Sequence, residues 1–402
     1  MRKDARVSGM REFWRALPTE GRWLLSTVAI QTLGRGLTLP FTIIYLHEVR
    51  GFDLALSGTL MGLIAVVGLI VTGPGGILID RFGARPVLIV GLVCMVLGCT
   101  LLAYATHPAV AAAGLILIGV NFGVNFALVN LGIGVGGIVG GFYVNVAEPE
   151  TFTVIFLINA ASSLIPMALL LGPLRHVRTQ SEPSVDESER GGYRQILRRP
   201  AVIWVSLLTF VAMFVGYGQM EAGFPAFARQ ISEVSTRTIG FAFAANTVVI
   251  VLLQFAVLKR IAGRRRTRVM WVMALVWAAS WLLLGATGLL PDTLAAAIGV
   301  IAFMGVFAFG ETLLQPTVPA VYNDLASDHT RGRYNAINSA AFQGGAITGP
   351  IAAGVLLDND LPAVFIGLMV VCCLGIGVMA LALERRITPQ VNGVVGAQPA
   401  VD

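Results

Sequence analysis

The chain has 402 residues, of which 56% are hydrophobic and 12% are charged, and its mean hydropathy is +0.79. Soluble globular proteins typically carry about 25% charged residues, so this composition excludes a soluble domain and places most of the chain in lipid. The net charge of +6 is expected to set membrane topology rather than to bind nucleic acid.

Charge-poor apolar runs predict the membrane-spanning helices. Each span needs about 20 apolar residues, and the chain offers eleven such runs. The run over residues 108–147 is the longest and is most polar at Asn121 and Asn125, so we expect it to form two helices joined by almost no loop. The chain is thus predicted to have twelve spans, within residues 24–46, 54–79, 86–106, 108–147, 151–174, 201–227, 239–258, 269–290, 294–318, 336–357 and 361–383.

The distribution of basic residues predicts which loops face the cytoplasm. With twelve spans, 24 of the 28 Lys and Arg residues fall on the side of both termini, Arg50, Arg229 and Arg237 fall on the other side, and Arg35 lies within a span. Cytoplasmic loops carry the excess of basic residues, so both termini are expected to be cytoplasmic. The N-terminal segment lacks the pattern of a cleaved signal peptide. We therefore expect a multi-pass integral protein of the plasma (inner) membrane.

A hydrophilic connector divides the predicted helices into two sets of six. It holds four acidic residues among serines and ends in a basic segment, which is expected to lie on the anionic inner leaflet. The predicted organisation is an N-terminal six-helix bundle at 1–174, a cytoplasmic linker at 175–200, a C-terminal six-helix bundle at 201–386 and a cytoplasmic tail at 387–402.

The two halves resemble each other in sequence, as in transporters built from repeats. The alanine run at Ala111 matches the run at Ala295 with an offset of 184 residues, whereas Gly137 matches Gly349 with an offset of 212. The difference between the two offsets indicates that the first half lacks about 28 residues. Helix 4 is then shortened to about 108–121, which covers about 21 Å of a hydrocarbon core of about 30 Å. A true deletion and a segment lost from the sequence are both open.

The turn at residues 76–86 resembles the signature loop of the major facilitator superfamily. The resemblance implies an all-α membrane protein of the major facilitator fold, with two six-helix bundles related by pseudo-two-fold symmetry. It also implies that Asp80 meets the positive N-terminal end of helix 11 near residues 331–334 and gates the cytoplasmic side. Alternatively, these charges only mark topology. The matching residues are Gly76, Asp80, Arg81, Gly83 and Arg85.

Two further segments are similar to those of drug and proton antiporters. Residues 132–141 in helix 5 resemble a glycine-rich antiporter motif, although close helix packing explains these glycines equally well. The segment around Glu311 resembles the multidrug antiporter branch, in which the glutamate of helix 10 takes up a proton. The motif glycines are Gly136, Gly137, Gly140 and Gly141.

Three ionisable residues lie well inside the predicted spans, and each is a functional candidate because a charge in lipid is costly. They are Arg35, Glu221 and Glu311. Family members line a central cavity with helices 1, 4, 7 and 10, so side chains at helical spacing from these charges are expected to meet there. The alternatives are that Arg35 pairs structurally with one glutamate and that the aromatic residues face lipid. The expected cavity residues are Gln31, Arg35, Thr38, Phe214, Tyr217, Met304 and Phe307, and the expected proton-coupling residues are Glu311 first and Glu221 second.

These features predict a secondary active transporter, most simply a proton-coupled exporter of amphipathic or cationic small molecules. The sequence has no nucleotide-binding loop and no His-Glu-x-x-His motif, so we expect neither an enzyme nor a cofactor or metal. The expected partners are a small-molecule substrate, protons and membrane lipids, without nucleic acid, for a monomeric carrier. Two alternatives stay open: a facilitator or importer of a small solute, with Arg35 as the counter-ion of an anion, and a non-transporting membrane sensor.

Overall fold

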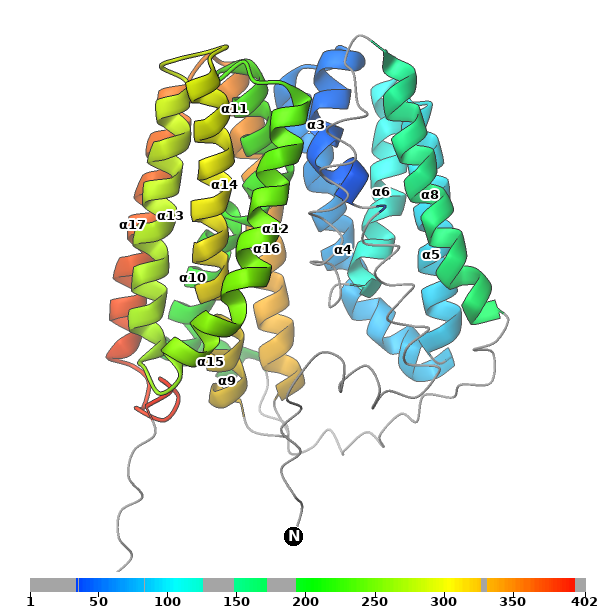
Figure 1. The fold of residues 1–402 in the computed structure, drawn as a ribbon. Helices are drawn as coiled ribbons and strands as arrows, with labels where there is room; N and C mark the ends of the chain where they lie inside the picture. The colour runs from blue at the N-terminus through cyan, green and yellow to red at the C-terminus, as the bar shows by residue number, and fades with distance from the viewer. Residues whose placement is uncertain are drawn as a thin grey trace, which may run out of the picture.

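The computed structural model describes residues 34, 36–82, 84–125, 148–171, 193–326 and 331–394, and every regular element in these ranges is a helix. Within them, nine segments are long and apolar enough to cross a membrane, and a tenth, Pro108–Asn121, is apolar but shorter. Two helix bundles stand side by side, one from each half of the chain (Figure 1). The fold class expected from the sequence is confirmed.

The N-terminal bundle begins, among the described residues, with the end of helix 1. That end is irregular, because a 3-10 turn and a π-helical turn flank one short α-helical turn. Four long helices follow it and form the remainder of the described bundle. In chain order the elements are η1 (Leu39–Phe41), α3 (Thr42–Ile44), η2 (Tyr45–Val49), α4 (Leu54–Phe82), α5 (Ala84–Ala103), α6 (Pro108–Asn125) and α8 (Pro149–Leu171).

The C-terminal bundle is described almost completely, and two of its predicted spans are interrupted. The predicted helix over 201–227 ends early at Gly216 and resumes through a π-helical turn, and the predicted helix over 294–318 ends before Pro316, which has no amide hydrogen to donate. The elements are α9 (Tyr193–Leu197), α10 (Pro200–Val215), η5 (Gln219–Gly223), α11 (Phe224–Gln230), α12 (Thr236–Ile261), α13 (Arg266–Thr287), α14 (Leu294–Leu314), α15 (Val318–Leu325), α16 (Arg331–Asp358) and α17 (Pro362–Glu384).

Local capping explains several of these boundaries. Ser235 accepts a hydrogen bond from the amide of Thr238 at 3.2 Å, and Thr293 accepts one from the amide of Ala296 at 3.1 Å, so α12 and α14 each begin at a side-chain cap. Proline occupies the first residue of α10 and α17, where the missing amide hydrogen costs nothing. The predicted helix starts at 201, 239, 294 and 361 therefore lie within three residues of the observed starts.

The predicted short helix 4 corresponds to α6. Its 18 residues span about 27 Å, slightly less than the hydrocarbon thickness, and they extend four residues past the predicted end at Asn121. Residues 126–147 lie outside the described part of the chain. The second helix expected within the run over 108–147 therefore stays a prediction, as does the proposed loss of about 28 residues.

The two bundles meet along α4 and α16. A Cβ atom on Gly58 would overlap the carbonyl oxygen of Pro350, and one on Gly354 would lie 2.6 Å from the carbonyl oxygen of Leu54, so these glycines permit the close approach. The amide of Leu54 also donates to Asp358 Oδ1 at 3.0 Å. These contacts cluster where helix 1 ends, and we call this end of the molecule the Glu48 end; α9 and α15 mark the opposite, linker end (Figure 1).

The chain after α17 folds back onto its own bundle. The amide of Thr267 donates to Asn392 Oδ1 at 3.0 Å, the amide of Arg266 donates to the Asn392 carbonyl at 2.8 Å, and Val391 packs against the core. Asn392 thus caps the first turn of α13. The predicted tail at 387–402 is therefore docked over its described part, which ends at residue 394.

Candidate functional site

Glu311 lies at the centre of a polar cluster inside the C-terminal bundle. Its side chain, on the last turn of α14, is 6% exposed. Asn246 of α12 donates from Nδ2 to Glu311 Oε2 at 2.6 Å, and the Tyr217 hydroxyl also hydrogen-bonds the carboxylate. A buried acid is tolerated only when partners satisfy its oxygen atoms, and these two donors come from two other helices.

The cluster extends from Glu311 towards the surface through Tyr217. Gln315, one turn after Glu311, is exposed and donates from Nε2 to the Tyr217 hydroxyl at 2.9 Å. The Tyr217 ring lies 5.8 Å from the ring of Phe342 on α16, measured between centroids and at an interplanar angle of 31°. A buried carboxylate, two amide side chains and an aromatic pair thus lie together, which is a suitable environment for a proton or an organic cation.

The seventh predicted span, helix 7, is formed by α10, η5 and α11, and the break in it places Tyr217 in this cluster. α10 ends at Gly216, and the carbonyl of Phe214, which the break frees, accepts a hydrogen bond from Gln219 Nε2 at 3.0 Å. The same nitrogen donates to the carbonyl of Gly349 on α16 at 3.1 Å, so the break is pinned to the neighbouring helix.

This break corrects one expectation. Phe214, Tyr217 and Glu221 were expected to share one α-helical face, but the turn at Gly216 and the π-helical segment interrupt the register on which that face depends. Phe214 and Glu221 are half-buried, and Glu221 lies within η5. The proposed proton-coupling role of Glu221 stays a prediction.

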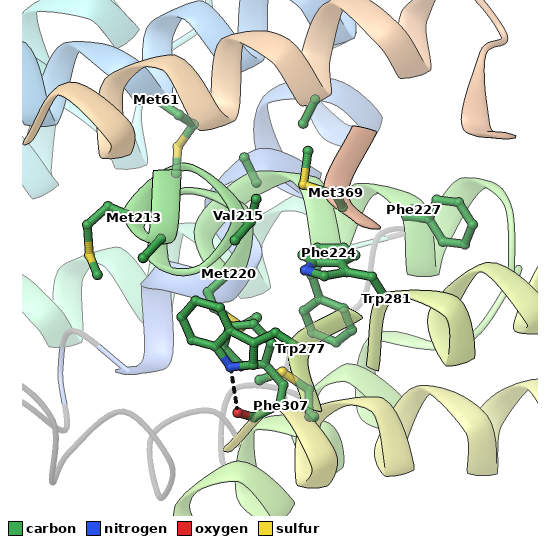
Figure 2. Close-up of a cluster of buried hydrophobic side chains, with 14 of the residues drawn as sticks. Met61, Met213, Val215, Met220, Phe224, Phe227, Trp277, Trp281, Phe307 and Met369 are labelled. Atoms are coloured by element: carbon green, nitrogen blue, oxygen red, sulfur yellow. Dashed lines mark hydrogen bonds between the residues drawn. The ribbon is translucent and has the colours of Figure 1, made fainter. Parts of the chain in front are cut away.

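The expected cavity residues of α14 face the interior of their own bundle. Met304 is fully buried, and the Phe307 ring stacks on Trp277 of α13 with centroids 4.6 Å apart and planes at 5° (Figure 2). Because α13 covers this face of α14, the two side chains offer no surface to a cargo here. They would line a cavity only in another conformation.

In the N-terminal bundle, Thr38 is buried against α8. Its hydroxyl oxygen accepts a hydrogen bond from Asn159 Nδ2 at 2.9 Å, and its carbonyl accepts one from the Thr42 hydroxyl at 2.8 Å. Gln31 and Arg35 lie outside the described residues, so the expected pairing of Arg35 with a glutamate stays a prediction.

The backbone of the gating motif is described except at one residue, whereas the helix 5 antiporter motif is not described. α4 contains Gly76, Asp80 and Arg81 near its end, and α5 contains Arg85 near its start, whereas Gly83 between them is not described. The contact expected between Asp80 and the start of α16 therefore stays a prediction. The helix 5 motif residues Gly136, Gly137, Gly140 and Gly141 are also outside the described part of the chain.

An ion pair closes the Glu48 end between the two bundles. Arg229 of α11 donates from Nε to Glu48 Oε1 at 2.9 Å and from Nη2 to Glu48 Oε2 at 2.7 Å, while its Nη1 bonds the carbonyl of Val234 at 2.9 Å. The two side chains are 23% and 19% exposed. The two parallel hydrogen bonds hold helix 1 and helix 7 together.

Four of these residues were not predicted as partners from the sequence. Asn246 could have been found, because it is a polar residue within the charge-free run over 239–258. Gln315 lies four residues after Glu311 and so shares its helical face. The pairing of Glu48 with Arg229 had no sequence signal, since both residues fell in predicted loops or span ends that were read only for topology.

Comparisons with known proteins agree on the family and the fold. The model of the Major Facilitator Superfamily matches residues 2–130, 122–310 and 232–399. An uncharacterized MFS-type transporter of Bacillus subtilis, YttB, is 24% identical over 92% of this chain and 96% of its own. Multidrug resistance protein 2 of the same organism is 23% identical over 88% and 93%. A crystal structure of a POT family transporter in complex with a thioalcohol-conjugated peptide has a TM-score of 0.72 at 16% identity, covering 91% and 96%.

Proposed function

The chain belongs to the major facilitator superfamily, and from this premise we propose that it is a proton-coupled exporter of amphipathic or cationic small molecules that works by alternating access. The cargo and a proton would compete for one buried carboxylate, that of Glu311. We further propose that the carrier is monomeric and lies in the plasma membrane with both termini in the cytoplasm.

One observation carries this proposal: Glu311 is buried yet hydrogen-bonded by side chains that serve either of its protonation states. Asn246 and Tyr217 donate to the ionised carboxylate. When the acid takes up a proton, the carbonyl oxygen of the Asn246 amide or the oxygen of the Tyr217 hydroxyl can accept a hydrogen bond from the new O–H group. The cluster can therefore hold Glu311 charged or neutral without leaving a buried group unsatisfied.

The surroundings of Glu311 favour a cationic cargo. The ring faces of Tyr217 and Phe342 lie beside the carboxylate cluster, and an aromatic face attracts a positive charge. An organic cation and a proton would each neutralise the same buried acid, so binding of one opposes binding of the other. The name of one relative, a multidrug resistance protein, supports a drug-like small molecule as the cargo.

The ion pair of Glu48 and Arg229 fits the proposed alternation. It closes the Glu48 end, which the count of basic residues assigns to the outside. We propose that this conformation is closed to the outside and that breaking the pair lets the bundles separate there. A carrier needs two such states, with the site exposed to one side in each.

Transport by the purified full chain in proteoliposomes tests the proposal. Ethidium, a lipophilic aromatic cation, is the probe, and an imposed proton gradient supplies the driving force. We expect gradient-driven ethidium movement that Glu311→Gln abolishes. Glu221→Gln tests the second candidate, and Asp292→Asn, an acid-to-amide change in the exposed loop before α14, is the matched control.

Three results would contradict the proposal in different ways. Ethidium movement that ignores the proton gradient would favour a facilitator. Gradient-driven movement that survives Glu311→Gln would remove Glu311 from the coupling step. No movement of ethidium in either direction, by protein that is folded and correctly inserted, would favour a carrier of a different solute or a non-transporting membrane protein.

A further inference from the structure

Trp277 of α13 lies between the two helices that carry Glu311 and Tyr217. Its side chain is fully buried, and neither the proton-coupling candidates nor the proposed cargo contacts include it. Figure 2 shows its indole beside Phe307, with Met220 and Phe224 of helix 7 nearby. The position of this rigid ring relative to the polar cluster suggests a specific task.

One edge of the indole fixes α14 next to Glu311. Trp277 Nε1 donates to the carbonyl of Phe307 at 3.0 Å, and the ring stacks on the Phe307 ring. A Cβ atom on Gly310 would overlap Cδ1 and Nε1 of the same ring, so α14 can approach the indole only because this residue is glycine. Gly310 immediately precedes Glu311.

The other edge of the indole contacts helix 7 next to Tyr217. A Cβ atom on Gly216 would lie 3.0 Å from Trp277 Cη2 and 2.6 Å from the carbonyl oxygen of Ala212. Gly216 immediately precedes Tyr217, at the point where α10 ends. The same flat ring therefore touches the backbone beside the carboxylate with its pyrrole edge and the backbone beside the tyrosine with its benzene edge.

We propose that Trp277 is a positioning residue that holds Glu311 and Tyr217 at hydrogen-bonding distance. The indole is a rigid spacer between two glycines, so its width sets the separation of the backbones that carry the two side chains. A smaller ring would let helix 7 and α14 shift and would lengthen or break the bond from Tyr217 to Glu311. This role rests on the proposed function, because Glu311 is the proposed proton carrier.

Trp281, one turn further along α13, provides a matched control. It is also fully buried, and it packs on Phe303 and Phe365 with centroids 5.1 Å and 5.7 Å away. Its Nε1 has no hydrogen-bond partner among the residues that the structure describes. Trp281→Phe therefore removes the same atoms from the same helix and the same core as Trp277→Phe. Unlike Trp277→Phe, it breaks no hydrogen bond to α14.

The experiment uses the purified full chain, and its readout is the infrared band of Glu311. Spectra are recorded at acidic and alkaline pH, without cargo or gradient, to observe the protonated and the ionised carboxyl group. The band that disappears in Glu311→Gln is assigned to Glu311. Trp277→Phe is expected to shift this band and Trp281→Phe to leave it in place, although both lower the unfolding temperature. In the ethidium assay, Trp277→Phe is expected to reduce turnover about tenfold or more, as misplacement of reacting groups does.

Gly310→Ala tests the same contact without altering any hydrogen-bonding side chain, and it serves if Trp277→Phe does not fold. It is expected to displace the indole and to shift the Glu311 band in the same way. Equal bands in wild type, Trp277→Phe and Gly310→Ala would overturn the proposal, as would an equal shift from Trp281→Phe. Because the band is read without transport, a wild-type protein that fails to move ethidium would refute the proposed function alone.

Discussion

Removing the charge of Glu48 is expected to open the contact between the bundles at that end. Glu48→Gln abolishes the ion pair and one of its two strong hydrogen bonds, while Arg229 keeps its bond to the carbonyl of Val234. Both side chains are about four-fifths buried, so this ion pair should stabilise the closed state more than an exposed ion pair would. Its contribution is comparable to that of hydrogen bonds to charged groups, about 1–3 kcal/mol. That corresponds to a shift of about 5- to 150-fold in the equilibrium between closed and open states.

Distances between spin labels measure this shift directly. One label replaces Thr106, in the exposed loop before α6, and the other replaces Leu289, an 80% exposed residue after α13, on a background without the four native cysteines. Glu48→Gln is expected to add a longer distance to the distribution. The exchange of charges, Glu48→Arg with Arg229→Glu, should partly restore the short one.

A matched control separates this effect from a general loss of charge. Glu384 pairs with Arg265 and Arg268 within a single bundle at the linker end, so Glu384→Gln should leave the label distance unchanged. The reasoning would be refuted if the label distances in Glu48→Gln and in Arg229→Gln had the same distribution as in the wild type. Additive effects of the two changes in the double variant would also refute it, since partners in one ion pair are not independent.

Three further outcomes follow from contacts in the same structure. Asn392→Ala removes the cap of α13 and should destabilise the protein by about 1 kcal/mol, measured as a lower midpoint of thermal unfolding, with Gln390→Ala as control. Asp358→Ala removes the acceptor for the Leu54 amide, and the spin-label distance should lengthen without a large change in unfolding. Gly58→Leu should have a stronger effect on that distance, because its side chain must displace the backbone at Pro350.

Periodicity and charge were sufficient to predict most of the fold. The apolar runs located the described spans, because lipid requires each crossing to satisfy its own backbone hydrogen bonds in a helix. The predicted and observed starts of a helix agreed where a proline or a capping side chain marked the start, as at Pro200 and Thr293. Hydropathy alone could not locate the break at Gly216, since apolar residues flank it on both sides.

The candidate site was predictable in part. Charges within the predicted spans pointed to Glu311 and Glu221, and helical spacing from Glu221 pointed to Tyr217; the structure brings Glu311 and Tyr217 into contact. The orientation of Phe307 was not predictable, because helical spacing assigns a residue to a face but does not say which neighbouring helix covers that face. Only the position of Trp277 on α13 shows that this face is inside the bundle.

Helix 7 connects the two features on which the proposed cycle depends. Its break carries Tyr217, which contacts Glu311, and its far end carries Arg229, which contacts Glu48. Gln219 ties the segment between them to Gly349 of α16.

A proton or cargo at Glu311 can open the Glu48 end only through a difference in its affinity for the two states. The ion pair contributes about 5- to 150-fold in favour of the closed state, so that difference must offset this contribution together with the other contacts between the bundles to reverse the equilibrium. The apparent affinity of the Glu48→Gln protein for ethidium should therefore change by the factor by which the spin labels show the open fraction to change, while the affinity of the open state itself stays the same.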